Sequence, residues 1–323
     1  MSYLLTNSSA LTALQNLTMT QNALSSTQNQ LSTGLAINTA ADNSSYWSIA
    51  QTMGSDNGAL GAVASSLNVS SQMVSTFTSA MSQSISVVNA IKNDLAEAQT
   101  SGANLTQIGA DIALKQGSLI TIANGTTFNG QNWLNGNNDS TGAAQSATIA
   151  DSYTNSGGVT GFSIAAATGT GSAGMDGLSL FTTTPATSTT VGATAPTGGL
   201  LGNVQTTGGT QTNGGAYTVL GMVVSSTTTT NNLQDMMQEV NSALSSMETA
   251  SSTLGAFSNT ITQQQSFISS MQTNLTNGVG ALVDADMNKV STRLQALQTQ
   301  QQLGVQSLSI ANQSSQMILK LFQ

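Results

Sequence analysis

The sequence predicts a mainly α fold, with terminal coiled-coil helices, a second helical-bundle layer and a small β-rich central insertion of Gly, Thr and Ser. Three observations predict it. Apolar residues recur at heptad spacing in both terminal segments. In the parts of the chain between these segments, wider apolar stripes recur at helical spacing. Both prolines, Pro185 and Pro196, lie in the middle, so the flanks are free to form long helices whereas the centre is not.

The N-terminal segment predicts one helix over residues 1–38. It is entered through the capping candidates Thr6 and Asn7, and a polar break at 38–43 follows it. Its heptad positions, alternately three and four residues apart, are Tyr3, Asn7, Ala10, Leu14, Leu17, Gln21, Leu24, Gln28, Leu31 and Leu35.

The C-terminal segment carries a matching pattern. A helix that runs from near Asn231 past Leu275 is predicted to break at Asn277-Gly278, and the terminal helix is predicted to begin around Gly280. The heptad positions of this segment are Val283, Met287, Val290, Leu294, Leu297, Gln301, Gly304, Leu308, Ala311, Ser315, Ile318 and Phe322.

Further helices are predicted between these ends. One runs from the polar break through Leu95 to a turn at Gly102, and another covers about 104–124. Because the break at 38–43 has a counterpart at 277–280, the simplest fold joins the two ends in one domain and the next helices in a second. The predicted domains are a terminal coiled-coil domain of 1–40 with 279–323, a helical second-layer domain of 41–138 with 222–278, and a variable outer domain of 139–221.

The central stretch 139–221 has a different composition. Its only charged residues are three aspartates, and it is packed with Gly, Thr, Ser and Ala. The pieces GFSIAAA (161–167) and AYTVLGMVV (216–224) are strand-like and lie between glycine-rich turns. A small surface β-domain is therefore favoured over a disordered linker, which the composition also allows.

Energetics predicts that the terminal helices assemble with other copies. Two lone helices that share one narrow apolar stripe bury too little surface to offset the entropy lost on ordering them. We therefore expect these helices to be disordered in the free monomer and to fold when neighbouring subunits cover them. The predicted assembly seam consists of Leu14, Leu17, Leu24, Leu31, Leu35, Val290, Leu294, Leu297, Leu308, Ile318 and Phe322.

Composition excludes several classes of function. Charged residues make up 6% of the chain, and five basic residues against 13 acidic ones are too few to neutralise a nucleic-acid backbone. The absence of Cys and His excludes disulfides, thiol nucleophiles, His-based catalysis and almost every transition-metal site. We therefore expect the protein to bind no cofactor and to have no enzymatic activity. No apolar window of eighteen residues exists, which predicts no membrane insertion. The low charge favours a surface buried between like subunits over a neutral soluble one.

The acidic residues offer no predicted catalytic pair. Asp284 and Asp286 are interpreted as acids near the N-terminus of the terminal helix, where the helix dipole favours them. Asp235 and Glu239 lie one turn apart and are predicted to occupy a solvated face. Both of these pairs are therefore interpreted as structural.

Three segments resemble a known family. LSTGLAINTAADNSSYWSIAQTM (31–53), TFNGQNWLNG (127–136) and the segment from TNGVGALVDADMNKV to the C-terminus (276–323) closely resemble bacterial flagellins, in the variant seen in alphaproteobacteria. They occur in the family's order, and the resemblance covers about 1–136 and 230–323. The central insertion is unmatched.

The resemblance implies a function and a set of partners. It implies a structural subunit that polymerises into the bacterial flagellar filament for motility, is exported unfolded by the flagellar type III system and lies in the extracellular filament. Its implied partners are further copies of itself, other flagellins, hook-associated and cap proteins, and an export chaperone at the C-terminal helix. A hook–filament junction protein is the alternative. The peptidases that some flagellins carry need an HExxH-type site, and this chain has no histidine.

The segment VNAIKNDLAEAQT (88–100) resembles the helical surface that innate immune receptors recognise on enteric flagellins. The candidate receptor-contact residues are Ile91, Lys92, Leu95 and Glu97. Lys92 stands where that motif usually has an arginine, and alphaproteobacterial relatives are generally poor agonists, so the resemblance implies weak recognition.

Overall fold

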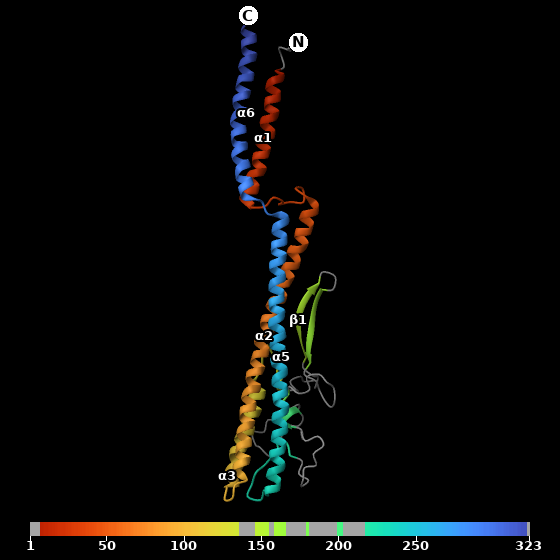
Figure 1. Ribbon diagram of the computed structural model, residues 1–323, viewed down its shortest axis with the longest axis vertical. Helices are drawn as coiled ribbons and strands as arrows, with labels where there is room; N and C mark the ends of the chain where they lie inside the picture. The colour runs from red at the N-terminus through yellow and green to blue at the C-terminus, as the bar shows by residue number, and fades with distance from the viewer. Residues whose placement is uncertain are drawn as a thin grey trace. The chain divides into compact units, whose positions relative to one another are not determined.

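The computed structural model describes residues 7–135, 146–154, 158–165, 179–180, 199–202 and 217–321. Long helices dominate these residues, which confirms the predicted mainly α fold (Figure 1). In chain order the elements are α1 (Ser8–Thr33), α2 (Ser44–Ala98), α3 (Leu105–Gly125), β1 (Ser146–Thr154), β2 (Gly158–Ala165), α4 (Gly199–Gly202), α5 (Thr230–Val283) and α6 (Met287–Leu321).

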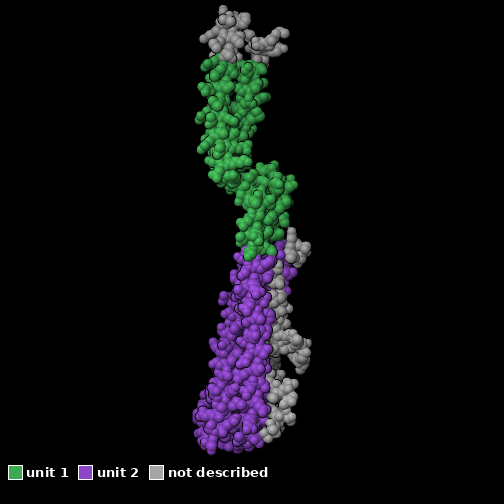
Figure 2. Space-filling view, viewed as in Figure 1, with its two compact units in different colours: residues 1–59, 270–323 green, residues 60–269 purple. Residues whose placement is uncertain are grey.

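The chain divides into two compact units (Figure 2). Unit 1 contains residues 1–59 and 270–323, and unit 2 contains residues 60–269. The boundary falls inside α2 and α5, so each of these long helices contributes to both units. The three domains predicted from the sequence stay a prediction, and the central one, 139–221, lies largely outside the described residues.

Local capping signals set the ends of the terminal helices. Asn7 caps α1, since its side-chain oxygen accepts a hydrogen bond from the backbone N–H of Ala10 at 3.1 Å, as the sequence predicted. Gly34 ends α1 in the left-handed conformation, with φ at 74°, and donates to the carbonyl of Gln30. Asp286 caps α6 by accepting from the backbone N–H groups of Asn288 and Lys289.

The predicted helix break at Asn277-Gly278 is wrong, because α5 continues through it to Val283. A Cβ added at Gly278 would lie 2.6 Å from the terminal methyl of Met53, so this glycine lets α2 approach α5 closely. The interruption occurs at residues 284–286 instead, and the terminal helix begins at Met287 rather than around Gly280. Tertiary packing here overrides a local turn signal.

The helices α2 and α5 run antiparallel within each unit. In unit 1 the side-chain amide of Asn57 donates to the hydroxyl of Thr276 at 3.3 Å. In unit 2 the amide of Gln265 donates to the side-chain oxygen of Asn68 at 3.0 Å. Both bonds lie on exposed positions, so they fix register at the rim of a contact that apolar side chains bury.

Unit 2 has a dense core formed by the inner faces of α2, α3 and α5. Phe77 and Trp133, both fully buried, stack with ring centroids 4.6 Å apart. The buried amide of Gln116 donates to the carbonyls of Val219 and Met222, both at 2.9 Å. These bonds hold the segment 217–225 against α3 in an irregular conformation, so the strand predicted at 216–224 is wrong over its described part.

Four buried leucines, one on each of four short segments, form a hydrogen-bonded stack at the base of the central insertion. Leu180 donates to the carbonyl of Leu134, Leu201 to that of Leu180, and Leu220 to that of Leu201, at 2.8, 2.8 and 3.2 Å. We call these residues the leucine ladder. It ties segments from 134 to 220 into the core of unit 2, which the sequence did not predict.

The β structure among the described residues is one antiparallel hairpin of β1 and β2, in which Ile149 lies opposite Phe162. The pairing shifts between Ala150 and Ser152, as at a bulge. The strand predicted at 161–167 coincides with the second half of β2, and the predicted β-rich character of the insertion is confirmed to this extent.

The predicted solvated face at Asp235 and Glu239 is wrong. Asp235 is 1% exposed and Glu239 is fully buried in unit 2. Their neighbours Leu233, Met236 and Val240 are buried as well, so α5 is covered over more of its circumference here than one amphipathic stripe requires.

Candidate assembly interface

The terminal helices α1 and α6 pack side by side and antiparallel within unit 1 (Figure 1). The side-chain amide of Asn7 donates to the carbonyl of Ala311 at 2.9 Å, and a Cβ on Gly304 would lie 3.3 Å from a methyl of Leu17. At the other end Leu35 forms an antiparallel bridge with Asp284. The missing Cβ of Gly304 thus allows close approach in the middle of the pair.

Most described heptad positions of α6 lie on its covered side, and their role as an assembly seam stays a prediction. Val290 and Leu297 are buried, and the other inward positions are half-buried: Leu294, Gln301, Gly304, Leu308 and Ala311. Met287, which fits the same spacing, is exposed instead. The side chain of Ile318 and the whole of Phe322 lie outside the described residues.

In α1, several of the covered residues lie one position before the heptad residues that were expected to be covered. Leu17, Leu24 and Leu35 are half-buried, but Leu14 is 48% exposed and Leu31 also lies in the exposed class. The alternate inward positions are the small residues Ala13, Thr20 and Thr27 instead. Small side chains let the two helices approach, so the seam within one chain is narrower than the apolar spacing indicated.

The α1–α6 pair leaves a set of large apolar side chains open, which we call the open apolar surface. It consists of Leu11, Leu14 and Met19 on α1 and Leu303, Val305 and Ile310 on α6, with exposures from 48% to 62%. No charged residue occurs in α1 or in 294–319. Exposed apolar groups without interspersed charges are typical of a surface that another molecule covers.

Charges in unit 1 gather near the start of α2 and of α6. Asp42 accepts hydrogen bonds through one carboxylate oxygen from the backbone N–H groups of Thr39 and Asn38 and from the Thr39 hydroxyl. These donors lower the pKa of Asp42 below its ordinary value of 3.8, and the backbone N–H of Thr39 contributes most to this effect. Asp286 caps α6 as expected of a helix N-terminal acid, whereas Asp284 lies in the bridge to Leu35.

The comparisons with known proteins agree with this geometry. Residues 4–139 match the model of the bacterial flagellin N-terminal helical region, and residues 237–322 match that of the C-terminal helical region. The chain is 37% identical to flagellin C of Rhizobium meliloti strain 1021 and 37% identical to the flagellin of Brucella melitensis biotype 1. It is 31% identical to flagellin A of Rhizobium meliloti, and each alignment covers all of both chains.

The chain belongs to the bacterial flagellin family. The relatives from Rhizobium and Brucella confirm the resemblance to alphaproteobacterial flagellins. Flagellins are structural subunits of the extracellular flagellar filament and not enzymes, and these matches give no support to the alternative of a hook–filament junction protein. Among the described helices none is long and apolar enough to cross a membrane.

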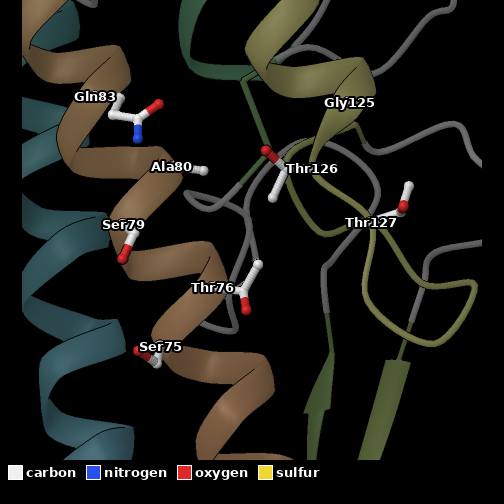
Figure 3. A pocket seen from close by; sticks show the side chains of 8 residues that line it. All are labelled: Ser75, Thr76, Ser79, Ala80, Gln83, Gly125, Thr126 and Thr127. Atoms are coloured by element: carbon white, nitrogen blue, oxygen red, sulfur yellow. The ribbon is translucent and has the colours of Figure 1, made fainter.

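Unit 2 of this flagellin carries a hydroxyl-rich groove of about 450 Å³ (Figure 3). Ser75, Thr76, Ser79 and Gln83 of α2 line one side, and residues 125–127, at and just after the end of α3, line the other. No charged group lies among the lining residues. Such a groove offers hydroxyl and amide groups for hydrogen bonds.

The candidate receptor-contact residues divide by burial. Ile91 and Leu95 are fully buried in unit 2, while Lys92 is half-buried and Glu97 is exposed. A protein that bound this face of the folded subunit would therefore touch Lys92 and Glu97 but not the two apolar residues. Recognition by a receptor stays a prediction, restricted to these two side chains.

Proposed function

We propose that this flagellin polymerises into the filament through the predicted assembly seam together with the open apolar surface of the α1–α6 pair. The observation that carries the proposal is the position of Leu14. It belongs to the heptad pattern of α1 but lies outside the contact with α6, about half exposed. A second copy that covers it would complete the seam that one chain leaves unfinished.

The energetics favour association of like copies. Full burial of a leucine contributes about 1.5–3 kcal/mol, so covering the open apolar surface supplies a substantial driving force for each added subunit. Because α1 carries no charge, this burial requires no desolvation of ions. Assembly through apolar seams is therefore expected to persist at high salt concentration.

The test is assembly of purified chains with Leu14→Asp. The substituted chain should fail to form sedimentable filaments, because a carboxylate would be buried without a partner at each contact. Leu14→Met, which keeps the apolar volume, and Asn93→Asp, which adds the same charge on an exposed part of α2 in unit 2, are the matched controls and should assemble. Normal filaments from Leu14→Asp would overturn the proposal.

We also infer the family's further partners for this chain. It would leave the cell unfolded through the flagellar type III system, with an export chaperone on the C-terminal helix, and the filament would contact hook-associated and cap proteins at its ends. Apolar positions at the end of α6, such as Leu308 and Ile318, support a chaperone there, because an unassembled seam needs a cover. Truncation of residues 304–323 should abolish co-purification with that chaperone.

A further inference from the structure

The start of α2 carries an aromatic patch turned to solvent. Tyr46, Trp47 and Ile49 are exposed, with Trp47 at 37%, whereas Ala50 on the next turn is buried. The other tryptophan of the chain, Trp133, is fully buried and stacked on Phe77. Exposed Trp and Tyr side chains next to one another are typical of the residues that anchor protein interfaces.

A fixed carboxylate lies beside this patch. Asp42 is exposed and precedes α2, and its hydrogen bonds to Thr39 and Asn38 use one oxygen, Oδ2. These bonds leave its other oxygen, Oδ1, open to a further donor. The residues Asp42, Tyr46, Trp47 and Ile49 therefore form an acidic aromatic patch, in which hydrogen bonds hold the carboxylate in place.

The start of α6 carries two exposed cations that follow the acids Asp284 and Asp286. Lys289 and Arg293 are exposed, lie four residues apart on one helix face and form no ion pair with any described residue of the chain. Two of the five basic residues of the chain are therefore exposed here without an ion pair among the described residues, although Asp286 caps the same helix and complements its dipole.

The two patches suit a contact between copies. An open helical polymer requires heterologous contacts, in which one patch of a subunit meets a different patch of the next. We call the exposed side chains of Met287, Lys289 and Arg293 the basic patch. This patch offers two cations and the acidic aromatic patch offers one carboxylate, and each is partly apolar. Arginine also stacks favourably on tryptophan.

We propose that the acidic aromatic patch of one subunit binds the basic patch of a second copy, with Arg293 against Asp42 and Trp47. This inference rests on the proposed function and adds a specific lateral contact to it. The contact is distinct from the open apolar surface, since it lies at the starts of α2 and α6 rather than along α1 and the later turns of α6. It directs which faces of neighbouring copies meet.

Complementation between two charge variants tests the contact. Ser45→Lys places a cation in the acidic patch at an exposed position and leaves the hydrogen bonds of Asp42 intact, and Arg293→Glu reverses the basic patch. Each variant alone should show a critical concentration for seeded assembly raised about 1.5-fold to fivefold, the range expected of surface charge pairs. An equimolar mixture should assemble nearly as well as the wild type, because the introduced ammonium group of one variant would then meet the introduced carboxylate of the other in alternate contacts.

Quenching of tryptophan fluorescence by acrylamide tests the aromatic half. Monomers should contain one accessible tryptophan, Trp47, and filaments none, while Trp47→Phe chains should contain none in either state. If wild-type chains assemble but Trp47 stays accessible in the filament, or if the mixture is no better than its components, this inference is wrong and the proposed function stands. If wild-type chains do not assemble, both are wrong.

Discussion

The α1–α6 pair of unit 1 and the bundle of unit 2 are built from similar helical spacing but reach opposite degrees of burial. In unit 2 the inward residues of α2, α3 and α5 are almost all inaccessible, and the side-chain N–H group of the buried Gln116 has backbone partners. In the α1–α6 pair the described inward side chains are mostly half-buried, while leucines such as Leu11 and Leu303 are open. The difference supports our proposal that one region completes its core within the chain and the other is completed by further copies.

The largest loss of stability is expected from deleting residues 140–220. This deletion removes Leu180, Leu201 and Leu220 from the leucine ladder, and each buried leucine lost costs about 2–5 kcal/mol. Deleting only the hairpin residues 146–165, with a short Gly/Ser link, leaves the ladder and should be far milder. Urea unfolding of both chains measures the effect. Equal stabilities would show that the ladder contributes little to unit 2.

A single core truncation is expected to come next. Phe77→Ala removes a fully buried ring that stacks on Trp133 and should lower the free energy of unfolding by about 3–5 kcal/mol. Val69→Ala on the exposed side of the same helix is the matched control and should change it by less than about 0.5 kcal/mol. Calorimetric unfolding of the monomer measures both. A small effect of Phe77→Ala would contradict the assignment of the core to unit 2.

Leu294→Asp should have the opposite effect to a core truncation: it should affect assembly much more than the stability of the monomer. Leu294 is half-buried on the α1-facing side of α6, so its loss should change monomer unfolding by less than about 1 kcal/mol and yet abolish filaments. Circular dichroism melting and sedimentation of seeded assembly measure the two effects. A loss of monomer stability comparable with that of Phe77→Ala would mean that the α1–α6 pair is already a complete core.

The smallest effect is expected at Asp42. Because the folded-state pKa of Asp42 is lowered, its contribution to stability is present above pH 3.8 and is lost as the pH falls through the lower, folded value. The amide resonances of Asn38 and Thr39 should titrate with a midpoint below 3.8, and Asp42→Asn should remove the titration. A midpoint at or above 3.8 would contradict the hydrogen bonds described for this loop.

The sequence predicts most helices because their apolar spacing is local information. It fails where burial depends on what lies across a contact. The local sequence around Gly278 predicts a helix break, but the glycine is needed because the Met53 side chain packs closely against it. Asp235 and Glu239 read locally as solvated, since nothing near them in the sequence shows that α5 is covered on more than one side there.

The candidate interface is predicted in part. The covered residues of α1 recur with the predicted period, but they include the small residues Ala13, Thr20 and Thr27 and not Leu14. A search for large apolar residues does not find small residues as contact positions. The leucine ladder could not be predicted, since its members lie on four short segments far apart in the sequence. Conversely, the joint occurrence of the terminal motifs is enough to identify the family without the fold.

Hydrogen exchange of the monomer and of the filament tests the central claim most directly. We expect the amides of α1 and α6 to exchange quickly in the monomer and to become strongly protected in the filament, because neighbouring copies complete the core of the α1–α6 pair. Amides around Leu119 in α3 should be protected in both states, since unit 2 is complete in one chain. Equal protection of α1 and α6 in the monomer and in the filament would contradict the claim that the terminal helices require other copies.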